Sequence, residues 1–433
     1  MIISTSKEKI AVGVVAAILI GVGQAQAGGF APREQSAEAQ GASFAGVAAG
    51  AGSLSSMFWN PATITNMPGW QSSWQLSGIL PYASDTPLPT TATFGLGGTG
   101  NQAGSALLPS SYSSYQVNEQ IWLGLGINTP FGLGTKNPRP SAPQLWGLTT
   151  TLMSEDINPN IAYKFNDWVS VGLGLQVMYF KVRQTQATAP VLAPPTAILT
   201  GDSWGVGFTA GVTLKPWEGA EIGIGYRSMV RQNIKGKLVS TALPGGFNPV
   251  ATTLDLPEIV TVGLRQRIAP QWTMLAGFEF TNWSRVKTLR VTSNGGFVPL
   301  GTTLALQRLN YKNGWMASLG AEYQWTPQWT LRAGVAYEKA PIDDSNRGVT
   351  LLDANRFWTS IGASYKYSQK LSFDVGYSHV FVKSGAINIA AAPPPGVPLA
   401  YSGRSRAHVD ILSVGLQYRW DDPKVATPIF AKN

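Results

Sequence analysis

The sequence predicts an all-β protein, a transmembrane antiparallel β-barrel of about 14 strands. Three observations support this prediction: long segments alternate apolar and polar residues, tryptophans follow tight turns, and charged residues are scarce. Charged residues make up 13% of the 433 residues, against roughly 25% in a soluble domain. Mean hydropathy is +0.01, and after the first 27 positions no apolar run reaches the about 20 residues that a membrane-spanning helix needs.

The alternation has a period of two residues, as in a strand with one face in lipid. In the segment 272–281, Trp272, Met274, Ala276, Phe278 and Phe280 share one face, while Thr273, Gly277, Glu279 and Thr281 share the other. The segments 329–338, 371–378 and 412–420 repeat this pattern. Soluble sheets use strands of about 5 to 6 residues, whereas strands that cross a bilayer need about 9 to 11. The length of these segments favours the membrane.

Several tryptophans stand directly after a tight polar turn. They occur in Asn166-Asp167-Trp168, Pro216-Trp217, Gln271-Trp272 and Gln328-Trp329. Indole rings prefer the lipid headgroup layer, so tryptophans at one depth are typical of the aromatic girdle of an outer-membrane barrel. The alternative is that these tryptophans fill an ordinary protein core at the start of each strand.

Together these signals predict fourteen strands, an even number that keeps all short turns on the periplasmic side. We expect them at residues 69–82, 104–117, 120–133, 148–165, 168–183, 202–215, 220–237, 254–268, 272–291, 304–325, 329–339, 354–367, 371–384 and 405–420. The barrel therefore spans residues 69–420, and residues 421–433 form a C-terminal extension.

The N-terminus has the features of a secretory signal peptide. Lys7 and Lys9 form a positive region, residues 10–23 an apolar region, and Ala25-Gln26-Ala27 a small-residue cleavage site. We expect residues 1–27 to be removed, which lowers the formal net charge from +9 to +8 because Lys7, Glu8 and Lys9 are lost. The alternative, a membrane anchor, is disfavoured because the apolar region is shorter than the about 20 residues of a spanning helix.

Residues 28–68 precede the first strand and follow a different pattern. Residues 41–50 are mainly Gly and Ala, which allow close approach of neighbouring backbones. Composition alone leaves two alternatives open: a flexible leader, or a plug packed inside the barrel.

Several short motifs in this region and beyond carry a family resemblance. They are Gly29-Phe30, Gly41, Ala45-Gly46, Asn60-Pro61-Ala62, Leu256-Pro257-Glu258, Pro270-Gln271-Trp272, Asn282-Trp283-Ser284 and Arg356-Phe357-Trp358. In these residues and their order the mature chain resembles the FadL family of outer-membrane transporters for long-chain fatty acids and other hydrophobic molecules.

The resemblance implies a monomeric fourteen-stranded barrel whose lumen is plugged by a small, partly helical N-terminal hatch, residues 28–68, with the motif Asn60-Pro61-Ala62. Phe30 matches the hatch residue that touches the ligand. In that family the ligand leaves sideways through a gap beside a kinked third strand, which here contains the lateral-gate residues Asn128, Pro130 and Gly132. The alternative is that Pro130 merely ends the strand.

The resemblance also suggests partners for a ligand carboxylate. Lys181 and Arg183 match a basic residue of the tight binding site, and Arg308 lies close to a second one. Lys181 and Arg183 share the parity of the lipid-facing Val177, so a bulge or an exit from the membrane must intervene. At Arg308 the register also allows Gln307. The alternative for all three cations is a place at solvated strand ends.

Two loops contain no charge. Residues 187–200 and 242–247 are rich in Ala, Pro, Leu and Gly, and exposed apolar loops indicate an interaction. They resemble the loops with which the family captures ligands, although Pro-rich loops also pack rigidly on one another.

The expected function is an outer-membrane channel of a Gram-negative bacterium that imports long-chain fatty acids or similar molecules. Alternatives are a channel for aromatic hydrocarbons and a general porin. With two histidines, His379 and His408, and no cysteine, we expect no enzyme, no metal site and no cofactor. The pI of about 9.6, without clustering of Lys and Arg, favours membrane lipid and lipopolysaccharide over nucleic acid as partners.

Overall fold

The fold is taken from a computed structural model, which describes residues 29–50, 52–89, 91, 95–189, 196–241, 243–392 and 399–422. The predicted signal peptide 1–27 and residues 423–433 of the predicted C-terminal extension lie outside the described residues. In the part of the chain that is described, no helix combines the length and the apolar character needed to cross a membrane.

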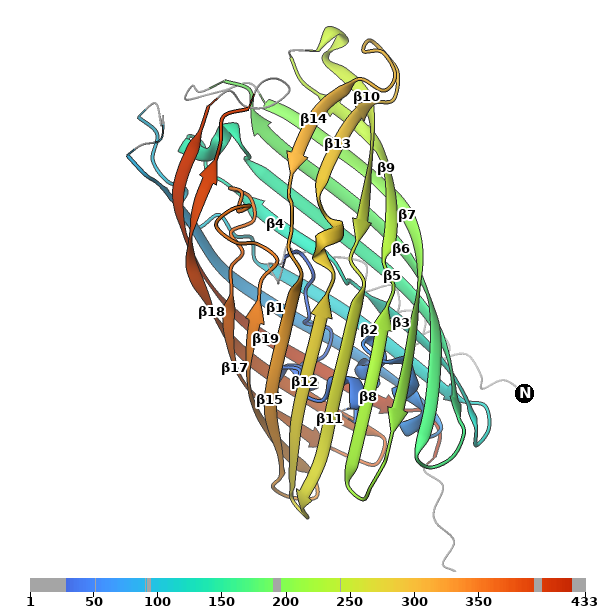
Figure 1. The fold of residues 1–433 in the computed structure, drawn as a ribbon. Helices are drawn as coiled ribbons and strands as arrows, with labels where there is room; N and C mark the ends of the chain where they lie inside the picture. Colours follow the sequence, from blue (N-terminus) through green and yellow to red (C-terminus); the bar gives the residue numbers. More distant parts are fainter. Residues whose placement is uncertain are drawn as a thin grey trace, which may run out of the picture.

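The strands form one closed antiparallel sheet (Figure 1). Its segments are β1 (Trp70–Pro87), β2 (Ala106–Gln116), β3 (Ile121–Asn128), β4 (Gly132–Lys136), β5 (Thr149–Lys164), β6 (Val169–Ala187), β7 (Thr196–Leu214), β8 (Ala220–Arg227), β9 (Val230–Val239), β10 (Phe247–Leu256), β11 (Ile259–Ala269), β12 (Trp272–Thr281), β13 (Thr288–Ser293), β14 (Thr303–Arg308), β15 (Gly314–Gln324), β16 (Trp329–Lys339), β17 (Arg356–Lys366), β18 (Leu371–Ile389) and β19 (Tyr401–Arg419). The pairing of β1 with β19 closes the cylinder, so neither the first nor the last strand is left as a free edge.

Five pairs of these segments continue one strand across a short interruption: β3 with β4, β8 with β9, β10 with β11, β12 with β13, and β14 with β15. The nineteen segments among the described residues therefore build fourteen strands, as the sequence predicts. The main differences lie at the extracellular ends, where β1 runs on to Pro87 and β10 begins as early as Phe247. No bilayer imposes apolar alternation on those ends, so the pattern does not reveal them.

The exterior confirms the predicted girdle. Trp168, Trp217, Trp272 and Trp329 are 58%, 58%, 45% and 38% exposed, so the alternative of core tryptophans is wrong for these four residues. On β12 the odd-numbered Leu275 is buried while its even-numbered neighbours face outward. The apolar face of the alternating pattern is thus the face that contacts lipid.

The N-terminal segment lies inside the barrel, where the blue ribbon in Figure 1 is surrounded by strands. It contains α2 (Ala37–Gln40) and the short 3₁₀ helices η2 (Val47–Ala49), η3 (Leu54–Phe58) and η4 (Pro61–Asn66), and most of its residues are buried. The segment is therefore a plug and not a free leader. Three further 3₁₀ turns, η5 (Ala142–Leu145), η6 (Pro244–Gly246) and η7 (Trp283–Arg285), interrupt the connections and one strand.

Glycines on the inner face of the wall make room for this plug. The inner-face glycines that contact it closely are Gly124, Gly172, Gly211, Gly223, Gly225, Gly263, Gly277, Gly320, Gly334, Gly362 and Gly376. A methyl group added at Gly211 would overlap the Asn60 side chain, and one at Gly223 would overlap the Ala48 carbonyl. The glycines on the polar face of the alternating pattern are thus the positions at which the plug contacts the barrel wall.

The two predicted capture loops are only partly described. β6 extends to Ala187 and β7 begins at Thr196, so the first loop is shorter than the predicted 187–200. Its residues 190–195 and residue 242 of the second loop lie outside the described residues.

Candidate functional site

Four aromatic rings meet where the plug begins. Phe30 of the plug lies with its ring centroid 4.7 Å from that of Trp283, 6.0 Å from Phe131 and 6.4 Å from Tyr311. All four side chains are buried. They come from four distant parts of the chain: the plug, the interruption between β3 and β4, η7, and the interruption between β14 and β15.

Further apolar side chains, all aliphatic except Phe180, surround this cluster. The buried ones are Leu133, Leu152, Met178, Phe180, Val230, Ile234, Leu254, Leu256, Val286, Ile342 and Leu351. Together with the four rings they form what we call the aromatic chamber. Most of its lining comes from the extracellular half of the barrel wall, directly above the plug. The lining is apolar, and its buried side chains pack directly against the Phe30 ring.

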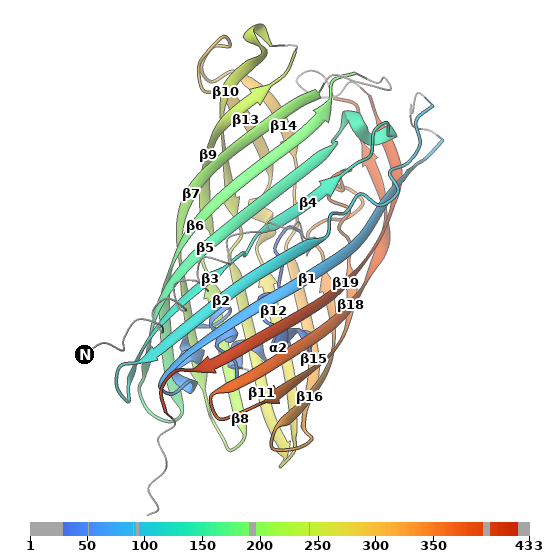
Figure 2. The same ribbon diagram turned by 180° about the vertical axis from the view of Figure 1, so that it is seen from behind.

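The third strand breaks beside this chamber (Figure 2). Pairing of β2 with β3 ends at Ser111 and Ile127, and one isolated bridge between Ala103 and Thr135 resumes it in the same register. The kinked segment, residues 129–131, bends inward between these points: the Gly132 N–H donates to the Phe30 carbonyl at 2.8 Å. Pro130 therefore lies within an interruption and does not end the strand, which continues as β4.

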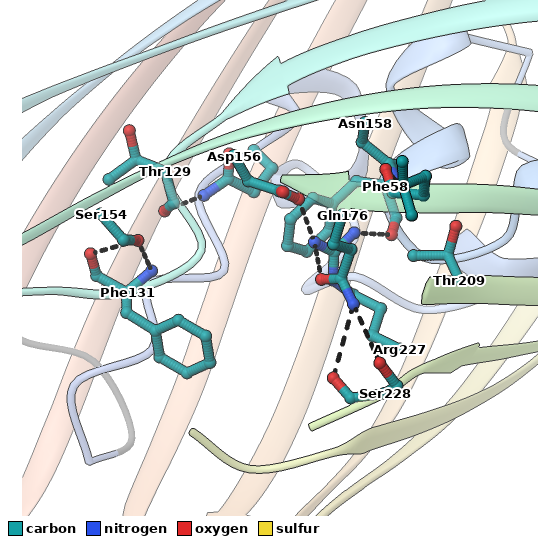
Figure 3. A network of polar contacts seen from close by, with 12 residues as sticks. Phe58, Thr129, Phe131, Ser154, Asp156, Asn158, Gln176, Thr209, Arg227 and Ser228 are labelled. Carbon is teal, nitrogen blue, oxygen red and sulfur yellow. Dashed lines mark hydrogen bonds and ion pairs between the residues drawn. The ribbon is translucent and has the colours of Figure 1, made fainter. Parts of the chain in front are cut away.

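The neighbouring strand β5 anchors the kinked segment. The Phe131 N–H donates to the Ser154 hydroxyl oxygen at 2.9 Å, and the Ser154 N–H donates to the Phe131 carbonyl at 2.9 Å (Figure 3). On the other side the Gln35 amide donates to the Thr129 carbonyl at 2.8 Å. Pro130 itself has no N–H to leave unpaired, which suits it to a break in the ladder.

A buried arginine ties the plug to the wall next to this break (Figure 3). The Arg227 guanidinium donates to Asp156 and to Gln176, both at 2.7 Å, and to the Phe58 carbonyl at 3.0 Å. It also lies 4.3 Å from the centroid of the Phe58 ring. Asp156 stands opposite Asn128 in the pairing of β3 with β5. One cation thus joins η3, β5 and β6 near the end of β3.

A second ion-pair network fixes the start of the plug. Arg33 contacts Glu279 of β12 and Glu338 of β16, each at 2.8 Å. Arg356 of β17 lies 3.7 Å from Glu338 and pairs with Asp353. The backbone N–H of the residue before Phe30, Gly29, donates to Asp353 at 2.7 Å.

Unpartnered polar atoms lie between this network and the kinked segment. Among the described residues, both carboxylate oxygens of Glu34 and both polar side-chain atoms of Asn128 are buried without a hydrogen-bond partner. Burial raises the pKa of the Glu34 carboxyl to about 7, and the backbone N–H of Glu34 and then the charge of Arg33 offset part of this rise. Such groups are rare in a protein interior, and they offer contacts to the polar end of a ligand.

The motif Asn60-Pro61-Ala62 fastens the lower part of the plug. The Asn60 side-chain amide donates to the Ala48 carbonyl at 2.7 Å and to the Val212 carbonyl of β7 at 2.9 Å. Its side-chain oxygen accepts from the Ala62 N–H at 2.9 Å and caps η4, with Pro61 at the first position. The motif is thus a link between plug and wall, far from the kinked segment in the chain.

Lys181, Arg183 and Arg308 are not brought to the aromatic chamber. On β6, Phe180 faces inward. Lys181 and Arg183 have the opposite parity, and their exposed side chains point outward. On β14, Gln307 faces inward, where it accepts from Gln184 at 3.4 Å, while Arg308 is exposed. Pairing of β6 with β7 shows no bulge, so the exit from the membrane explains the parity of Lys181 and Arg183.

The interior cations Arg33 and Arg227 escape prediction from sequence. One signal existed, since Arg33 is the single Lys or Arg in residues 28–68, and a lone cation in a buried plug needs a partner. Trp283 belongs to a motif of the resemblance, but nothing in the sequence shows that it meets Phe30.

A separate cavity lies below the plug. It has a volume of about 770 Å³ and is lined by the end of η4 and by residues of the short turns, among them Met67, Trp122, Lys164 and Lys215. Its polar lining and its place at the opposite end of the plug distinguish it from the aromatic chamber.

Comparisons with known proteins agree with this arrangement. The long-chain fatty acid transport protein of Escherichia coli (strain K12) is 29% identical over 413 residues, which cover 84% of this chain and 90% of that protein. The 47 kDa outer membrane protein of Pasteurella multocida is 28% identical, with 93% and 97% covered. A crystal structure of a Pseudomonas aeruginosa FadL homologue superimposes with a TM-score of 0.80 at 21% identity and covers 91% of this chain and 100% of that one.

The toluene transporter TbuX of Ralstonia pickettii has the same fold, with a TM-score of 0.66 at 16% identity over 90% of this chain and 100% of that one. The family model for outer membrane protein transport proteins (OMPP1/FadL/TodX) matches residues 18–420. The plugged barrel with its interrupted third strand therefore belongs to the OMPP1/FadL/TodX family of outer membrane transport proteins.

Proposed function

We propose that this protein imports long-chain fatty acids or similar hydrophobic molecules across the outer membrane. The ligand would bind in the aromatic chamber and leave sideways through the gap between β2 and the kinked segment. One observation carries the proposal: the barrel wall opens directly beside a buried aromatic cluster that includes a plug residue. Relatives named as long-chain fatty acid transport proteins support it.

The contact between Phe30 and Gly132 couples ligand binding in the chamber to opening of the lateral gap. A ligand that displaces the Phe30 ring also disturbs the 2.8 Å bond from the Gly132 N–H to the Phe30 carbonyl. The kinked segment then loses its link to the plug at the moment when the chamber fills. Binding and opening of the lateral gap, at Asn128, Pro130 and Gly132, are thus one event.

Energetics favours a long chain over a small aromatic molecule. Each buried methylene contributes about 0.8 kcal/mol, so ten of them contribute about 8 kcal/mol, against about 3 kcal/mol for exposing the Phe30 side chain. Toluene has nearly the shape of that side chain and gains little by replacing it. A channel for aromatic hydrocarbons remains the second candidate, because five aromatic rings line the chamber.

A general porin is the third alternative, and the plug disfavours it. We also propose that residues 28–68 act as one hatch, that residues 69–420 act as the barrel, that the protein is a monomer, and that lipopolysaccharide surrounds it. Contact of Lys181, Arg183 and Arg308 with a ligand carboxylate stays a prediction. Their exposed side chains face away from the chamber, so such a contact would have to occur before the ligand enters it.

The test is ligand binding to the purified protein together with uptake by a strain that lacks its own transporter. We expect oleate to bind, and Phe30→Ala to change oleate affinity while Phe297→Ala, an exposed loop residue, does not. If the strain that carries this protein grew on toluene but not on oleate, the result would favour the hydrocarbon channel. A large steady conductance in a planar bilayer would refute a plugged channel.

A further inference from the structure

Six cations gather on the outer wall, away from the chamber. We call the surface formed by Lys181 and Arg183 of β6, Lys235 and Lys237 of β9, Arg290 of β13 and Arg308 of β14 the basic outer face. All six side chains are exposed. Among the described residues none of the six forms an ion pair with a carboxylate.

The register of the strands sets the height of this face. Tyr179 stands opposite Trp204, with ring centroids 5.2 Å apart. Two residues further toward the outside, Lys181 stands opposite Asp202, which in turn stands opposite Lys235. The cations therefore begin one step beyond an aromatic pair.

That aromatic pair marks the outer edge of the membrane. Trp168 of the lower girdle, directly before β6, and Tyr179 of β6 are eleven residues apart. At about 3.3 Å per residue this is about 36 Å along the strand, and a tilt of about 40° leaves about 28 Å along the barrel axis. An outer-membrane barrel has an apolar band of about 25 Å, so Lys181 and Lys235 lie at the depth of the lipid headgroups.

A pocket of about 450 Å³ opens in the middle of this face, between β9, β10 and β13. It exists because β10 and β13 pair only at Val250 with Ser293 and at Ala251 with Thr292, and then separate. Lys235 and Arg290 line its rim. Thr252, which also lines the pocket, stands opposite the inward-facing Ile234, so its side chain lies on the lumen side of the gap.

The charge of the face stays positive after its acids are counted. Arg231 and Asp255 form an ion pair at 2.7 Å and cancel. Asp202 stands between two of the six cations, and Glu155 of β5, opposite Tyr179, is a second acid on the outer side of the wall, so six cations face two acids. Below the pocket, Trp204, Val206 and Phe208 are 62%, 64% and 50% exposed, which provides an apolar surface at the depth of acyl chains.

We infer that the basic outer face binds the phosphorylated headgroup of an outer-leaflet glycolipid, with a phosphate in the pocket between Lys235 and Arg290. Arg and Lys are suited to phosphate oxygens, and basic surfaces at membrane depth attract anionic headgroups. The acyl chains lie along the exposed apolar strip of β7. This site is independent of transport and holds whichever hydrophobic molecule the chamber takes.

The test compares three probes on the full-length protein in detergent: a bisphosphorylated lipid A, the same lipid after phosphate removal, and inorganic phosphate. Native mass spectrometry measures retained lipid, and thermal melting measures stabilisation. The variant is Lys235→Gln with Arg290→Gln, and the matched control is Lys339→Gln with Lys383→Gln, two exposed cations on β16 and β18.

We expect the bisphosphorylated lipid to bind the wild type and the control equally, and the variant about thirtyfold more weakly, from about a five- to sixfold effect for each of the two cations. All variants should melt at the wild-type temperature without lipid, because the replaced side chains are exposed. Equal binding by the variant, or equal binding of the dephosphorylated lipid, overturns the inference. Inorganic phosphate binding as tightly as the lipid would assign the pocket to free anions and also overturn it.

Discussion

Replacing Arg33 by methionine should release the start of the plug. Its guanidinium contacts Glu279 and Glu338 at 2.8 Å, and the three side chains are 10%, 11% and 2% exposed. Methionine keeps much of the volume but leaves two carboxylates buried without their cation. Breaking a buried pair in this way costs about 3 to 5 kcal/mol.

The lower end of that range is the better expectation here. Glu338 keeps Arg356 at 3.7 Å and the Trp358 indole N–H at 3.0 Å, so only part of its charge is left uncompensated. A cost of about 3 kcal/mol shifts the equilibrium between docked and released plug by roughly 150-fold. Amide hydrogen exchange of residues 29–50 in the membrane-embedded protein measures this shift directly.

Arg231→Met is the matched control, because the same change at an exposed pair with Asp255 costs about 1 kcal/mol or less. Arg33→Met combined with Glu279→Gln should recover part of the protection, since one stranded charge is removed. If exchange of the plug amides in Arg33→Met is as slow as in the control, the ion pairs do not hold the plug and the reasoning fails.

Three more predictions concern the plug and the kinked segment. Gly211→Leu should push Asn60 off β7 and raise single-channel conductance, which would stay at the wild-type level if the plug tolerates the side chain. Ser154→Ala leaves the Phe131 N–H without its acceptor at a cost of about 1 to 3 kcal/mol, and should speed ligand exit; unchanged release kinetics of a fluorescent fatty acid would contradict this. Because burial raises the pKa of Glu34 to about 7, the folded state holds a proton that the unfolded state has lost, so stability should fall as pH rises from about 4.5 to 7. Glu34→Gln should remove that fall in unfolding experiments at matched pH values, and an unaltered pH profile would show that Glu34 does not titrate there.

The strand count and the lipid face are predictable because they depend on local sequence. Each crossing needs its own period-two pattern and its own length, whatever the other strands do. The outward position of Trp168 and Met274 can therefore be predicted without knowing which strands pair with theirs. The strand ends beyond the membrane, such as Phe247 at the start of β10, are not predictable in this way.

At Lys181 and Arg183 the family resemblance and the alternation of the strand lead to different predictions. The resemblance implies contact with the ligand, whereas the alternation places both side chains on the outside. Parity alone places them outward, and the structure agrees, because β6 continues without a bulge past the aromatic pair that ends the apolar band. Whether an outward side chain lies in the apolar band or among the headgroups depends on its height along the barrel axis. That height can be determined only from the register of several strands.

Period, strand number, turn positions and the girdle are determined by the sequence itself, since lipid acts on each strand separately. The aromatic chamber, the inward bend at Pro130 and the buried pairs of Arg33 are decided only by the closed barrel. Arg33 and Glu338 are 305 residues apart in the chain, and a contact across a lumen leaves no periodic trace in either segment. Closure alone brings such residues together, because it is the shared interior that makes a lone charge costly.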